Sequence, residues 1–432
     1  MSVAPTPAPG SNAAAALGDA IPPVAHAANT ANGWRHQLPV YSPLSAAAVL
    51  AGVRAAAGKA RPNQAQDRLI ALLCERYSPK ALLLTDSGTA ALTAALIGVL
   101  RDRPGGAVAV PAFSCYDVAT AADGADVPVF LYDTDPTALA PDLASLRAAL
   151  RRGAAAVVVV HLYGCPVDLV EVNRLAAEAG ATVIEDAAQA AGATLNNRPA
   201  GAQGSLAVLS FGRGKGLTGG SGGALLAHDA VGQRVLERVR GLLGEPQRGW
   251  RELLTLTAQL LLARPNLYAL PAALPLLRLG ETIYRQPRPL RAASAAVGPV
   301  VAATWVLAER EVEVRRRNAA RLLVELGRKP GFETIRTSQH GRPSYLRLPV
   351  LASPAIRRSA VGTVARHLGI APGYPKALPD LEPFGDRCLN RDAAFPGARL
   401  LAARLCTLPT HGRLEARDLA RLEQWIRAVG GP

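Results

Sequence analysis

The chain alternates short apolar runs with helix-length segments rich in Ala and Leu, and this alternation limits the folds that are open to it. Continuous Val, Leu and Ile runs joined by helical segments are typical of parallel strands that are buried on both faces of a sheet. The pattern therefore predicts a doubly wound α/β domain whose ligands bind at the carboxyl ends of the strands. The runs occupy residues 81–89, 107–114, 127–135, 155–164, 181–189, 205–212 and 222–229.

Beyond these runs the pattern changes and predicts a smaller C-terminal α+β domain. An amphipathic helix is expected at about residues 295–326, a strand at 344–351 and a closing helix at about 414–429. The Ala- and Pro-rich start of the chain is typical of a disordered tail. We therefore expect four parts, which are the disordered tail (1–35), a large domain (36–245), an apolar insertion (246–294) and the small domain (295–432).

Residues 253–280 form a long apolar stretch that raises the question of membrane insertion. Arginines, prolines and Gln259 interrupt the stretch before about eighteen consecutive apolar residues are reached. We predict short buried or interface helices that serve as a lid or subunit contact, and no transmembrane span. A peripheral contact of this stretch with a membrane surface stays open as the alternative.

The formal net charge of the 432 residues is +15, which suits nucleic acid, an anionic membrane surface or phosphorylated small molecules. The sequence shows no interleaving of basic and aromatic residues and no nucleic-acid-binding motif, so a nucleic-acid partner is not expected. Much of the charge is arginine on predicted helices. In residues 308–326 the apolar residues recur at helical spacing, and the arginines are expected on the solvated face.

The five cysteines are widely spaced and include no CxxC pair. This spacing indicates neither a disulfide framework nor a zinc site, and we expect no bound metal. The N-terminus lacks a basic region followed by an apolar one, so no secretory signal is predicted. These features together favour a reducing, cytoplasmic location.

The first strand end reads TDSGTAALTAAL and has the composition of an anion-binding turn. Asp86 or Ser87 can cap a helix that begins near Thr89, and Gly88 lets the backbone turn closely. Backbone N–H groups and a hydroxyl would then point outward from a helix N-terminus, where anions are stabilised. An ordinary strand–turn–helix with a good N-cap is the alternative for this segment alone.

Two further strand ends carry Asp186 and Lys215. Asp186 directly follows a buried strand, where a carboxylate most often caps the next helix. Lys215 follows Ser210 and stands between Gly214 and Gly216, and these glycines leave its amine unshielded and the backbone open to a bulky ligand. An anion cradle, a carboxylate and an accessible lysine together match pyridoxal 5′-phosphate (PLP), which has a phosphate, a pyridine nitrogen and an aldehyde.

The order and spacing of several segments resemble the DegT-type family of PLP-dependent nucleotide-sugar aminotransferases, which have the aspartate-aminotransferase-like fold (fold type I). The likeness extends from about Pro43 to Val300 and, through 373–384 and 405–414, nearly to the C-terminus. It implies a large PLP-binding domain with a mixed, mainly parallel seven-stranded sheet flanked by helices, and a smaller C-terminal α+β domain. The segments are DSGTAAL (86–92), VPAFS (110–114), VVVHLYGCPVDL (158–169), VIEDAAQAAGA (183–193), LSFGRGKGL (209–217) and GGALLAHD (222–229).

The resemblance implies a role for each matching residue of the cofactor site. Lys215 would form the Schiff base with the cofactor and shuttle the proton between the substrate carbon and the cofactor. Asp186 would pair with the pyridine nitrogen, and Gln189 would contact the phenolic oxygen of the ring. The phosphate would be held at the first strand end and by one further hydroxyl, from Ser87, Gly88, Thr89 and Ser210.

The resemblance also implies an aromatic residue that stacks on the cofactor ring. The matching place holds Cys115, followed by Tyr116, and we predict that Tyr116 stacks on the ring. His161 and Tyr163 are expected to shape the floor of the site. A buried structural role is the alternative for His161.

Two segments depart from the family pattern. In the family, the Asn of an NYR-like segment reaches the phosphate of the neighbouring subunit, whereas here that Asn falls on a proline within residues 285–298. Arg288 or Arg291 would supply the charge instead. The GGSGG turn carries Ser221 where an acidic residue is frequent. Both departures lie near the substrate side, so they bear on the identity of the sugar more than on the cofactor.

The resemblance implies a PLP-dependent aminotransferase that moves the amino group of glutamate to a nucleotide-linked keto sugar, for polysaccharide or glycoconjugate biosynthesis. It also implies a homodimer with active sites at the interface. Alternatives are a PLP-fold sugar dehydratase or other amine-chemistry enzyme, and a catalytically silent, membrane-associated scaffold. In the related dehydratases His replaces the Schiff-base Lys, so Lys215 favours transamination. The sugar, its ring carbon and the pathway do not follow from the residues.

Overall fold

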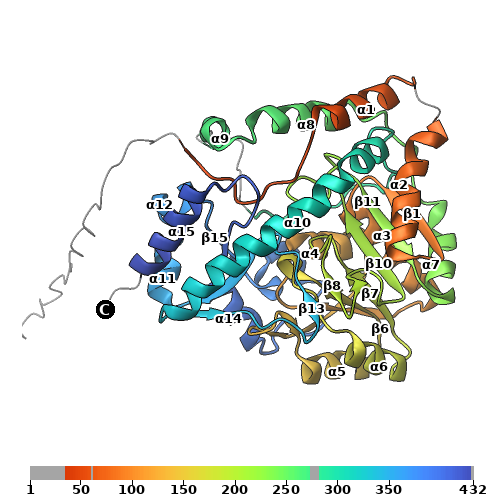
Figure 1. Cartoon of the computed structure of the whole chain (residues 1–432). Coiled ribbons are helices and arrows are strands. Elements are labelled where there is room, and N and C mark those ends of the chain that lie inside the picture. Colours follow the sequence, from red (N-terminus) through yellow and green to blue (C-terminus); the bar gives the residue numbers. More distant parts are fainter. Residues whose placement is uncertain (1–34, 60–61, 273–281, 430–432) are drawn as a thin grey trace, which may run out of the picture. The chain divides into compact units, whose positions relative to one another are not determined.

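The computed structural model describes residues 35–59, 62–272 and 282–429, and the fold is shown in Figure 1. The expected disordered tail (1–35) lies outside the described residues except for Arg35. Residues 273–280 of the apolar stretch also lie outside them. The division of the chain at residues 245 and 295 stays a prediction.

A seven-stranded mixed sheet forms the large layer of the structure, and each of the seven apolar runs contributes one strand. The spatial order is β1-β11-β10-β7-β6-β2-β3. β11 is antiparallel to β1 and β10, and the other four pairs are parallel, which confirms the mainly parallel sheet. The strands are β1 (Ala81–Thr85), β2 (Ala107–Pro111), β3 (Val129–Tyr132), β6 (Ala154–Val160), β7 (Thr182–Asp186), β10 (Leu206–Ser210) and β11 (Gly223–Ala227).

Helices cover both faces of this sheet, which explains the continuous apolar runs. In β6, Val158 and Val160 pack in a core with residues of α3 (Gly88–Asp102), α4 (Tyr116–Gly124) and α7 (Ala230–Arg240). Their neighbours Val157 and Val159 pack on the other face with α5 (Leu143–Arg151) and α6 (Val170–Glu178). Successive side chains of a strand point to opposite faces, so a strand covered on both sides must be apolar throughout.

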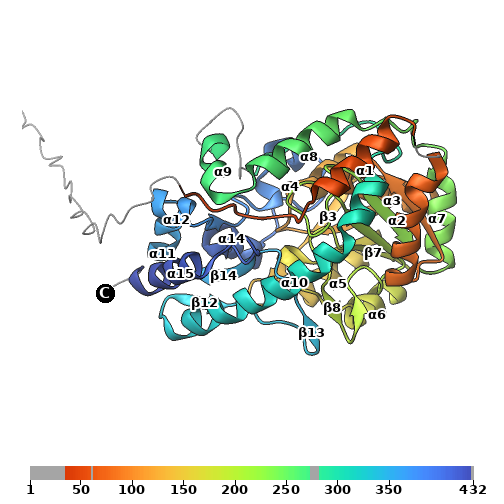
Figure 2. The same ribbon diagram turned by 45° about the horizontal axis from the view of Figure 1, so that its top comes forward.

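A second sheet is built from the C-terminal part of the chain. Its order is β12-β14-β16-β15, and all three pairs are antiparallel. The expected long helix is α10 (Val297–Arg328), which packs against α1, α2, α15 and β12 and links the two sheets (Figures 1 and 2). The strands are β12 (Phe332–Thr334), β14 (Leu348–Ala352), β15 (Ala371–Pro372) and β16 (Leu405–Leu408).

The predicted strand at 344–351 is confirmed only in its second half, because β14 begins at Leu348. Tyr345 has a left-handed backbone (φ 45°), which interrupts an extended segment. The expected closing helix is α15 (Ala416–Ala428). The remaining helices are α1 (Ala46–Ala56), α2 (Pro62–Tyr77), α11 (Pro354–Ser359), α12 (Thr363–His367), α13 (Glu382–Gly385) and α14 (Pro396–Arg404). The short strands are β4 (Thr134–Asp135), β5 (Ala140–Pro141), β8 (Thr194–Leu195), β9 (Arg198–Pro199) and β13 (Gly341–Arg342).

The apolar stretch forms two short helices in its described part, α8 (Trp250–Leu262) and α9 (Pro265–Ala272). Leu253 and Leu256 of α8 are buried in a core shared with α1, whereas Trp250 and Leu254 are exposed. The prediction of short helices is therefore confirmed for residues 253–272, whereas their role as a lid or subunit contact stays a prediction. None of the helices in the described ranges is long and apolar enough to cross a membrane.

Candidate active site

The turn between β1 and α3, which we call the anion-binding turn, holds the residues for which the sequence predicts an anion site. Ser87 is the N-cap of α3, and its Oγ accepts a hydrogen bond from the N–H of Ala90 at 3.1 Å. The same hydroxyl donates to Asp86 at 3.2 Å. The first N–H groups of a helix have no acceptor within the helix, and the helix dipole makes this end attractive to anions. Gly88 and Thr89, the first two residues of α3, therefore present the N–H groups of an anion site.

Ser210, at the end of β10, lies directly against this turn. A Cβ placed on Gly88 would come within 2.7 Å of the Ser210 Cβ and 3.0 Å of its Oγ. Contacts that short are not tolerated, so only glycine fits at residue 88 without displacing Ser210. The structure thus brings the predicted phosphate residues Ser87, Gly88, Thr89 and Ser210 together, and the hydroxyl and N–H donors suit a phosphate group.

Asp186 ends β7, and its register places it between Val160 of β6 and Val208 of β10. The residue is 8% exposed, and one carboxylate oxygen accepts the N–H of Ala188 at 3.0 Å. Burial raises the pKa of Asp186, although the Ala188 N–H and the positive charge of Lys215 act in the opposite direction. Lys215 is therefore close enough to Asp186 to interact with it electrostatically, as a shared cofactor site requires.

Gln189 is held by two hydrogen bonds from opposite ends of its amide. Its Oε1 accepts the N–H of Tyr163 at 2.9 Å, and its Nε2 donates to the Tyr374 hydroxyl at 2.8 Å. The ring of Tyr374 stacks on that of Tyr163 with a centroid distance of 5.8 Å. Since an amide nitrogen carries two N–H groups, one of them is still free to donate to a cofactor oxygen.

His161 is buried, and both of its ring nitrogens are used inside the protein. Nδ1 accepts the N–H of Val167 at 3.0 Å, so the proton is on Nε2, which lies 2.8 Å from the Glu185 carboxylate. This arrangement has the features of the structural alternative. A cofactor contact of His161 would have to use the face of the ring, and this predicted role stays untested.

The side chains of Cys115 and Tyr116 diverge at the start of α4. The Tyr116 hydroxyl accepts the N–H of Lys376 at 3.0 Å, and its ring centroid is 6.2 Å from that of Tyr374. Cys115 instead lies within electrostatic range of Lys215 and Asp186, and burial raises the pKa of its thiol to about 12. The thiol therefore stays protonated and unreactive at neutral pH.

Lys215 lies in a glycine-rich turn that connects β10 with β11. Gly214 has φ 70°, a left-handed conformation that favours glycine. A Cβ on Gly216 would come within 2.8 Å of the Ala191 Cβ, so the backbone next to Lys215 packs closely on the loop after β7. On the other side, the Lys215 carbonyl accepts a hydrogen bond from Ser42 at 2.8 Å.

The two segments that depart from the family pattern lie beside the anion-binding turn. Ser221 donates to Glu252 of α8 at 3.2 Å, so an acidic group approaches the GGSGG turn from another element. Burial raises the pKa of Asp86, while the Ser87 hydrogen bond and the charges of Arg288 and Arg291 oppose this shift. Both arginines are therefore within electrostatic range of the turn that is predicted to bind the phosphate.

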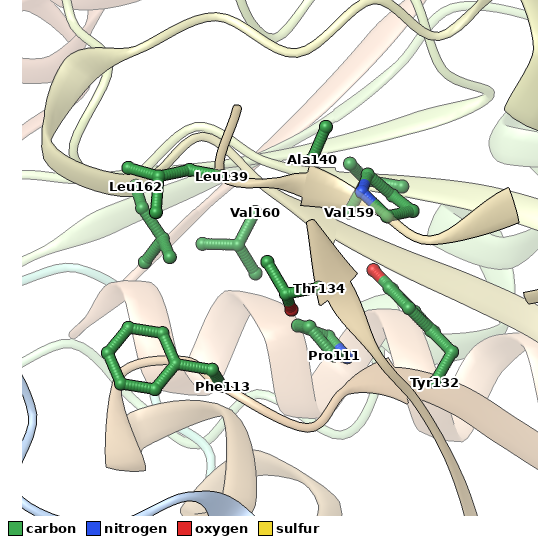
Figure 3. Close-up of a pocket in the computed structure, with 10 residues that line it drawn as sticks. Pro111, Phe113, Tyr132, Thr134, Leu139, Ala140, Val159, Val160 and Leu162 are labelled. Carbon is green, nitrogen blue, oxygen red and sulfur yellow. The ribbon is translucent and has the colours of Figure 1, made fainter. Parts of the chain in front are cut away.

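A small hollow lies at the carboxyl ends of β2, β3 and β6 and is shown in Figure 3. Apolar side chains, among them Phe113, Val160 and Leu162, form most of its wall. It contains none of the predicted cofactor residues. The hollow is therefore a packing gap beside the candidate site and not the site itself.

The sequence analysis did not predict three residues of the site region. Tyr374 stands in GYPKALPDLEPF, a segment that matches the family, but its type and spacing do not point to Gln189. Glu185 stands in the segment VIEDAAQAAGA, but no role was assigned to it, and Ser42 lies outside the matching segments. Among the described residues, no group of three or more His, Cys, Asp or Glu side chains could hold a metal ion.

An α/β fold with a lysine, a buried carboxylate and a helix N-terminus at one edge of the sheet is the arrangement of a fold type I PLP enzyme. Residues 62–256 match the model of the DegT/DnrJ/EryC1/StrS aminotransferase family. An L-glutamine:2-deoxy-scyllo-inosose aminotransferase of Streptomyces lividus is 32% identical over 334 residues, 73% of this chain and 71% of the relative. The chain belongs to the DegT/DnrJ/EryC1/StrS aminotransferase family.

Other relatives match over a shorter stretch. A UDP-N-acetyl-3-dehydro-alpha-D-glucosamine 3-aminotransferase of Acidithiobacillus ferrooxidans is 40% identical over 157 residues, 36% of this chain and 42% of the relative. An L-glutamine:2-deoxy-scyllo-inosose aminotransferase of Streptoalloteichus tenebrarius matches over 36% of each chain. The chain thus spans less than half the length of these two curated relatives.

Solved structures confirm the fold. AtS13 from Actinomadura melliaura superposes with a TM-score of 0.72 at 21% identity and covers 92% of this chain and 100% of that one. An Escherichia coli GDP-4-keto-6-deoxy-D-mannose-3-dehydratase, solved with bound hydrated PLP, superposes with a TM-score of 0.68 at 17% identity and covers 91% and 99% of the two chains. A dehydratase therefore shares this fold, so the fold alone does not identify the reaction and the site must do so.

Proposed function

We propose that the protein is a PLP-dependent aminotransferase that converts a keto sugar to an amino sugar. The observation that carries this proposal is the position of Lys215 within electrostatic range of the buried Asp186, beside the Ser87–Gly88 turn and Ser210. These groups suit an amine-reactive aldehyde, a pyridine nitrogen and a phosphate, respectively. When bound, PLP supplies an electron sink that stabilises negative charge on the substrate carbon.

The residues would divide the work as follows. Asp186 holds a proton on the pyridine nitrogen, which maintains the electron sink, and Gln189 donates its remaining N–H to the ring oxygen. The N–H groups of Gly88 and Thr89 and the Ser87 and Ser210 hydroxyls bind the phosphate. Lys215 takes up and returns a proton at Nζ. Tyr116 and His161 would border the ring, Tyr116 as the stacking residue.

We propose a nucleotide-linked keto sugar as the acceptor. Arg288 and Arg291 support this choice because their charges act at the β1–α3 turn and would attract a diphosphate. One relative is named for a UDP-sugar and another, from Caulobacter vibrioides, is a GDP-perosamine synthase. Glutamate is the proposed amino donor, and glutamine is the competing donor because several relatives carry it in their names.

A keto cyclitol without phosphate is the second candidate acceptor. The observation in its favour is that the Streptomyces lividus relative, which matches 73% of this chain, is named for 2-deoxy-scyllo-inosose. The two acceptors differ in charge. Added salt should lower kcat/KM for a nucleotide-linked sugar and leave that for an uncharged cyclitol nearly unchanged.

We further propose a cytoplasmic homodimer with active sites at the subunit interface, as the family resemblance implies. The proposed division of labour within each chain is a PLP-binding domain (36–245), an interface or lid segment (246–294) and a small domain (295–432). The exposed Trp250 and Leu254 of α8 support an interface role for the second of these parts. Sedimentation of the holoenzyme measures the oligomeric state.

The proposal is tested with purified protein, PLP, and glutamate or glutamine against a panel of nucleotide-linked keto sugars and keto cyclitols. A visible absorption band that shifts on addition of the donor is expected, together with an amino-sugar product. Borohydride reduction of the holoenzyme should attach the cofactor to Lys215 alone. Attachment at another lysine, or failure to retain PLP after reconstitution, would overturn the proposal.

Lys215→Ala should abolish multiple turnover while the protein stays folded, as measured by its melting temperature. Lys329→Ala is the matched control, because this lysine directly follows α10 and, within the described residues, its amine donates only to the exposed Arg427 carbonyl. Dehydrated sugar as the product, with no donor consumed, would identify the protein as a dehydratase instead. No turnover and no PLP band would favour the silent scaffold.

A further inference from the structure

A hydrogen bond joins the turn of Lys215 to a distant part of the chain. The Ser42 Oγ donates to the Lys215 carbonyl at 2.8 Å, and Ser42 is 1% exposed. Ser42 belongs to residues 35–45, an irregular segment before α1 that we call the N-terminal strap. The bond therefore connects the strap to the backbone of the proposed catalytic lysine.

The strap is anchored to the C-terminal part of the chain by several polar contacts. The Arg35 guanidinium donates to both carboxylate oxygens of Asp418 in α15, at 2.9 and 2.7 Å. His411 lies 2.8 Å from the Leu38 carbonyl, and burial lowers the pKa of His411 to about 4, so it donates as a neutral ring. Bidentate ion pairs and buried hydrogen bonds of this kind fix a segment that has no regular structure.

The residue before Ser42 is held by a fully buried arginine. Arg315 of α10 donates from Nη2 to the Tyr41 carbonyl at 2.6 Å, and Arg413 packs over the Tyr41 ring at 4.7 Å. The Arg315 Nη1 has no hydrogen-bond acceptor among the described residues, and Glu311 approaches Nε only to 3.6 Å. Burying such a guanidinium opposes folding, yet its short bond fixes the carbonyl next to Ser42.

The turn of Lys215 needs an external support because its own sequence provides little. Gly214 and Gly216 flank the lysine, and glycines lose more backbone freedom on ordering than other residues. One side of the turn packs on Ala191, and Ser42 supplies the hydrogen bond on the other side. A reacting side chain must be held within a fraction of an ångström of its productive position, so a loose turn would slow the reaction.

We propose that Ser42 is a positioning residue for Lys215. By holding the Lys215 carbonyl, the buried hydroxyl fixes the backbone from which the amine extends. The strap is itself held by α10 and α15, so these helices restrict the movement of the turn. The inference rests on the proposed function for its effect on activity. Its effect on the order of residues 211–222 does not depend on PLP.

The first test is hydrogen exchange of the full-length protein without cofactor. Ser42→Ala should speed exchange of peptides that cover residues 211–222 by about threefold to tenfold, the factor for loss of one ordinary hydrogen bond. Ser42→Thr, which restores the donor, should return exchange toward wild type. Ser45→Ala is the matched control, because it removes the N-cap of α1 but no contact with Lys215. Unchanged exchange in Ser42→Ala would overturn the proposal.

The second test uses the holoenzyme. Ser42→Ala should shift the pH at which the cofactor absorption band changes and lower kcat more than it raises KM, whereas Ser45→Ala should lower only the melting temperature. Should Ser42→Ala not fold, Ser42→Cys keeps the volume with a weaker donor and takes its place. A wild-type protein that fails to bind PLP would refute the proposed function and leave the exchange experiment to decide on Ser42.

Discussion

The Nε2 of His161 donates to the Glu185 carboxylate across 2.8 Å, and neither side chain is exposed to solvent. Both oxygens of this carboxylate are used. One also accepts the N–H of Gly201 at 2.5 Å, and the other accepts those of Gln203 and Gly204 at 2.8 and 3.0 Å. Glu185 thus fastens the loop after β9 to the strand that ends in Asp186.

Glu185→Gln should destabilise the protein by roughly 2–5 kcal/mol, since an amide NH2 in place of either oxygen faces N–H donors and leaves them unpaired. Chemical unfolding measures this loss. Glu171→Gln is the matched control, because the Glu171 carboxylate pairs with the exposed Arg174 on α6, and loss of this exposed pair should change stability little. Equal effects of the two substitutions would contradict the role of Glu185.

The same carboxylate predicts acid sensitivity. Burial opposes its ionisation, but the His161 hydrogen bond and the backbone N–H groups outweigh burial, and the pKa of Glu185 lies below its ordinary value. A carboxylate with a depressed pKa stabilises the fold above its unfolded pKa of about 4.3, and this contribution is lost as the pH falls through the folded pKa. Wild-type stability should therefore fall with acidification below about pH 4.3, and more steeply than that of Glu185→Gln.

Asp186→Asn should separate function from stability. The amide can still accept the Ala188 N–H, but it cannot hold a proton on a pyridine nitrogen, so turnover should fall about 100-fold or more. Because burial raises the pKa of Asp186, the ionised carboxylate opposes folding at neutral pH, and the variant should unfold no more easily than wild type. Steady-state kinetics and thermal unfolding without cofactor measure the two effects.

The control for this prediction is Asp168→Asn, which changes an exposed carboxylate that accepts the N–H of Val170. Its turnover should equal that of wild type. A variant Asp186→Asn that retains wild-type turnover would show that Asp186 does not touch the cofactor.

The sequence predicts the large sheet well because burial on both faces leaves a strong local signal. The polar residues at the ends of β1, β7 and β10 were found for the same reason, since Asp186 and Ser210 end their strands and Ser87 lies two residues after β1. Contacts between residues that are far apart in the sequence leave no such local signal. Gln189 and Tyr374 are 185 residues apart, and Ser42 and Lys215 are 173 apart, so no spacing rule relates them.

Periodicity also misplaced one arginine. The spacing of apolar residues in 308–326 puts the arginines on a solvated face, but Arg315 is fully buried. The strap and the loop around His411 cover that part of α10, and an irregular segment that covers a helix face has no apolar period of its own. The expectation of solvation was therefore wrong for Arg315, whereas Arg321 of the same run is about half exposed and pairs with Glu423.

Tyr374→Phe should weaken PLP binding about twofold to tenfold, because loss of one hydrogen bond frees the Gln189 amide to rotate away from the ring. Spectrophotometric titration of the protein with PLP measures this affinity. Tyr132→Phe is the control, since the Tyr132 hydroxyl donates to the Val158 carbonyl inside the sheet, and its loss should lower stability without changing PLP affinity. If Tyr374→Phe bound PLP as tightly as wild type does, Tyr374 would have no role in the cofactor site.

Gly88→Ala should impair the anion-binding turn and the fold together. The added Cβ would come within 2.7 Å of the Ser210 Cβ, so Ser210 must move away from the phosphate position, at a cost of about 1–3 kcal/mol. We expect inorganic phosphate to compete with PLP for the wild-type site and to compete less well for the variant. Gly327→Ala is the matched control, because a Cβ on this residue of α10 meets nothing within 4 Å and should stabilise the helix slightly. If Gly88→Ala were as stable as wild type and phosphate competed with PLP equally well in both proteins, the cofactor phosphate would bind elsewhere.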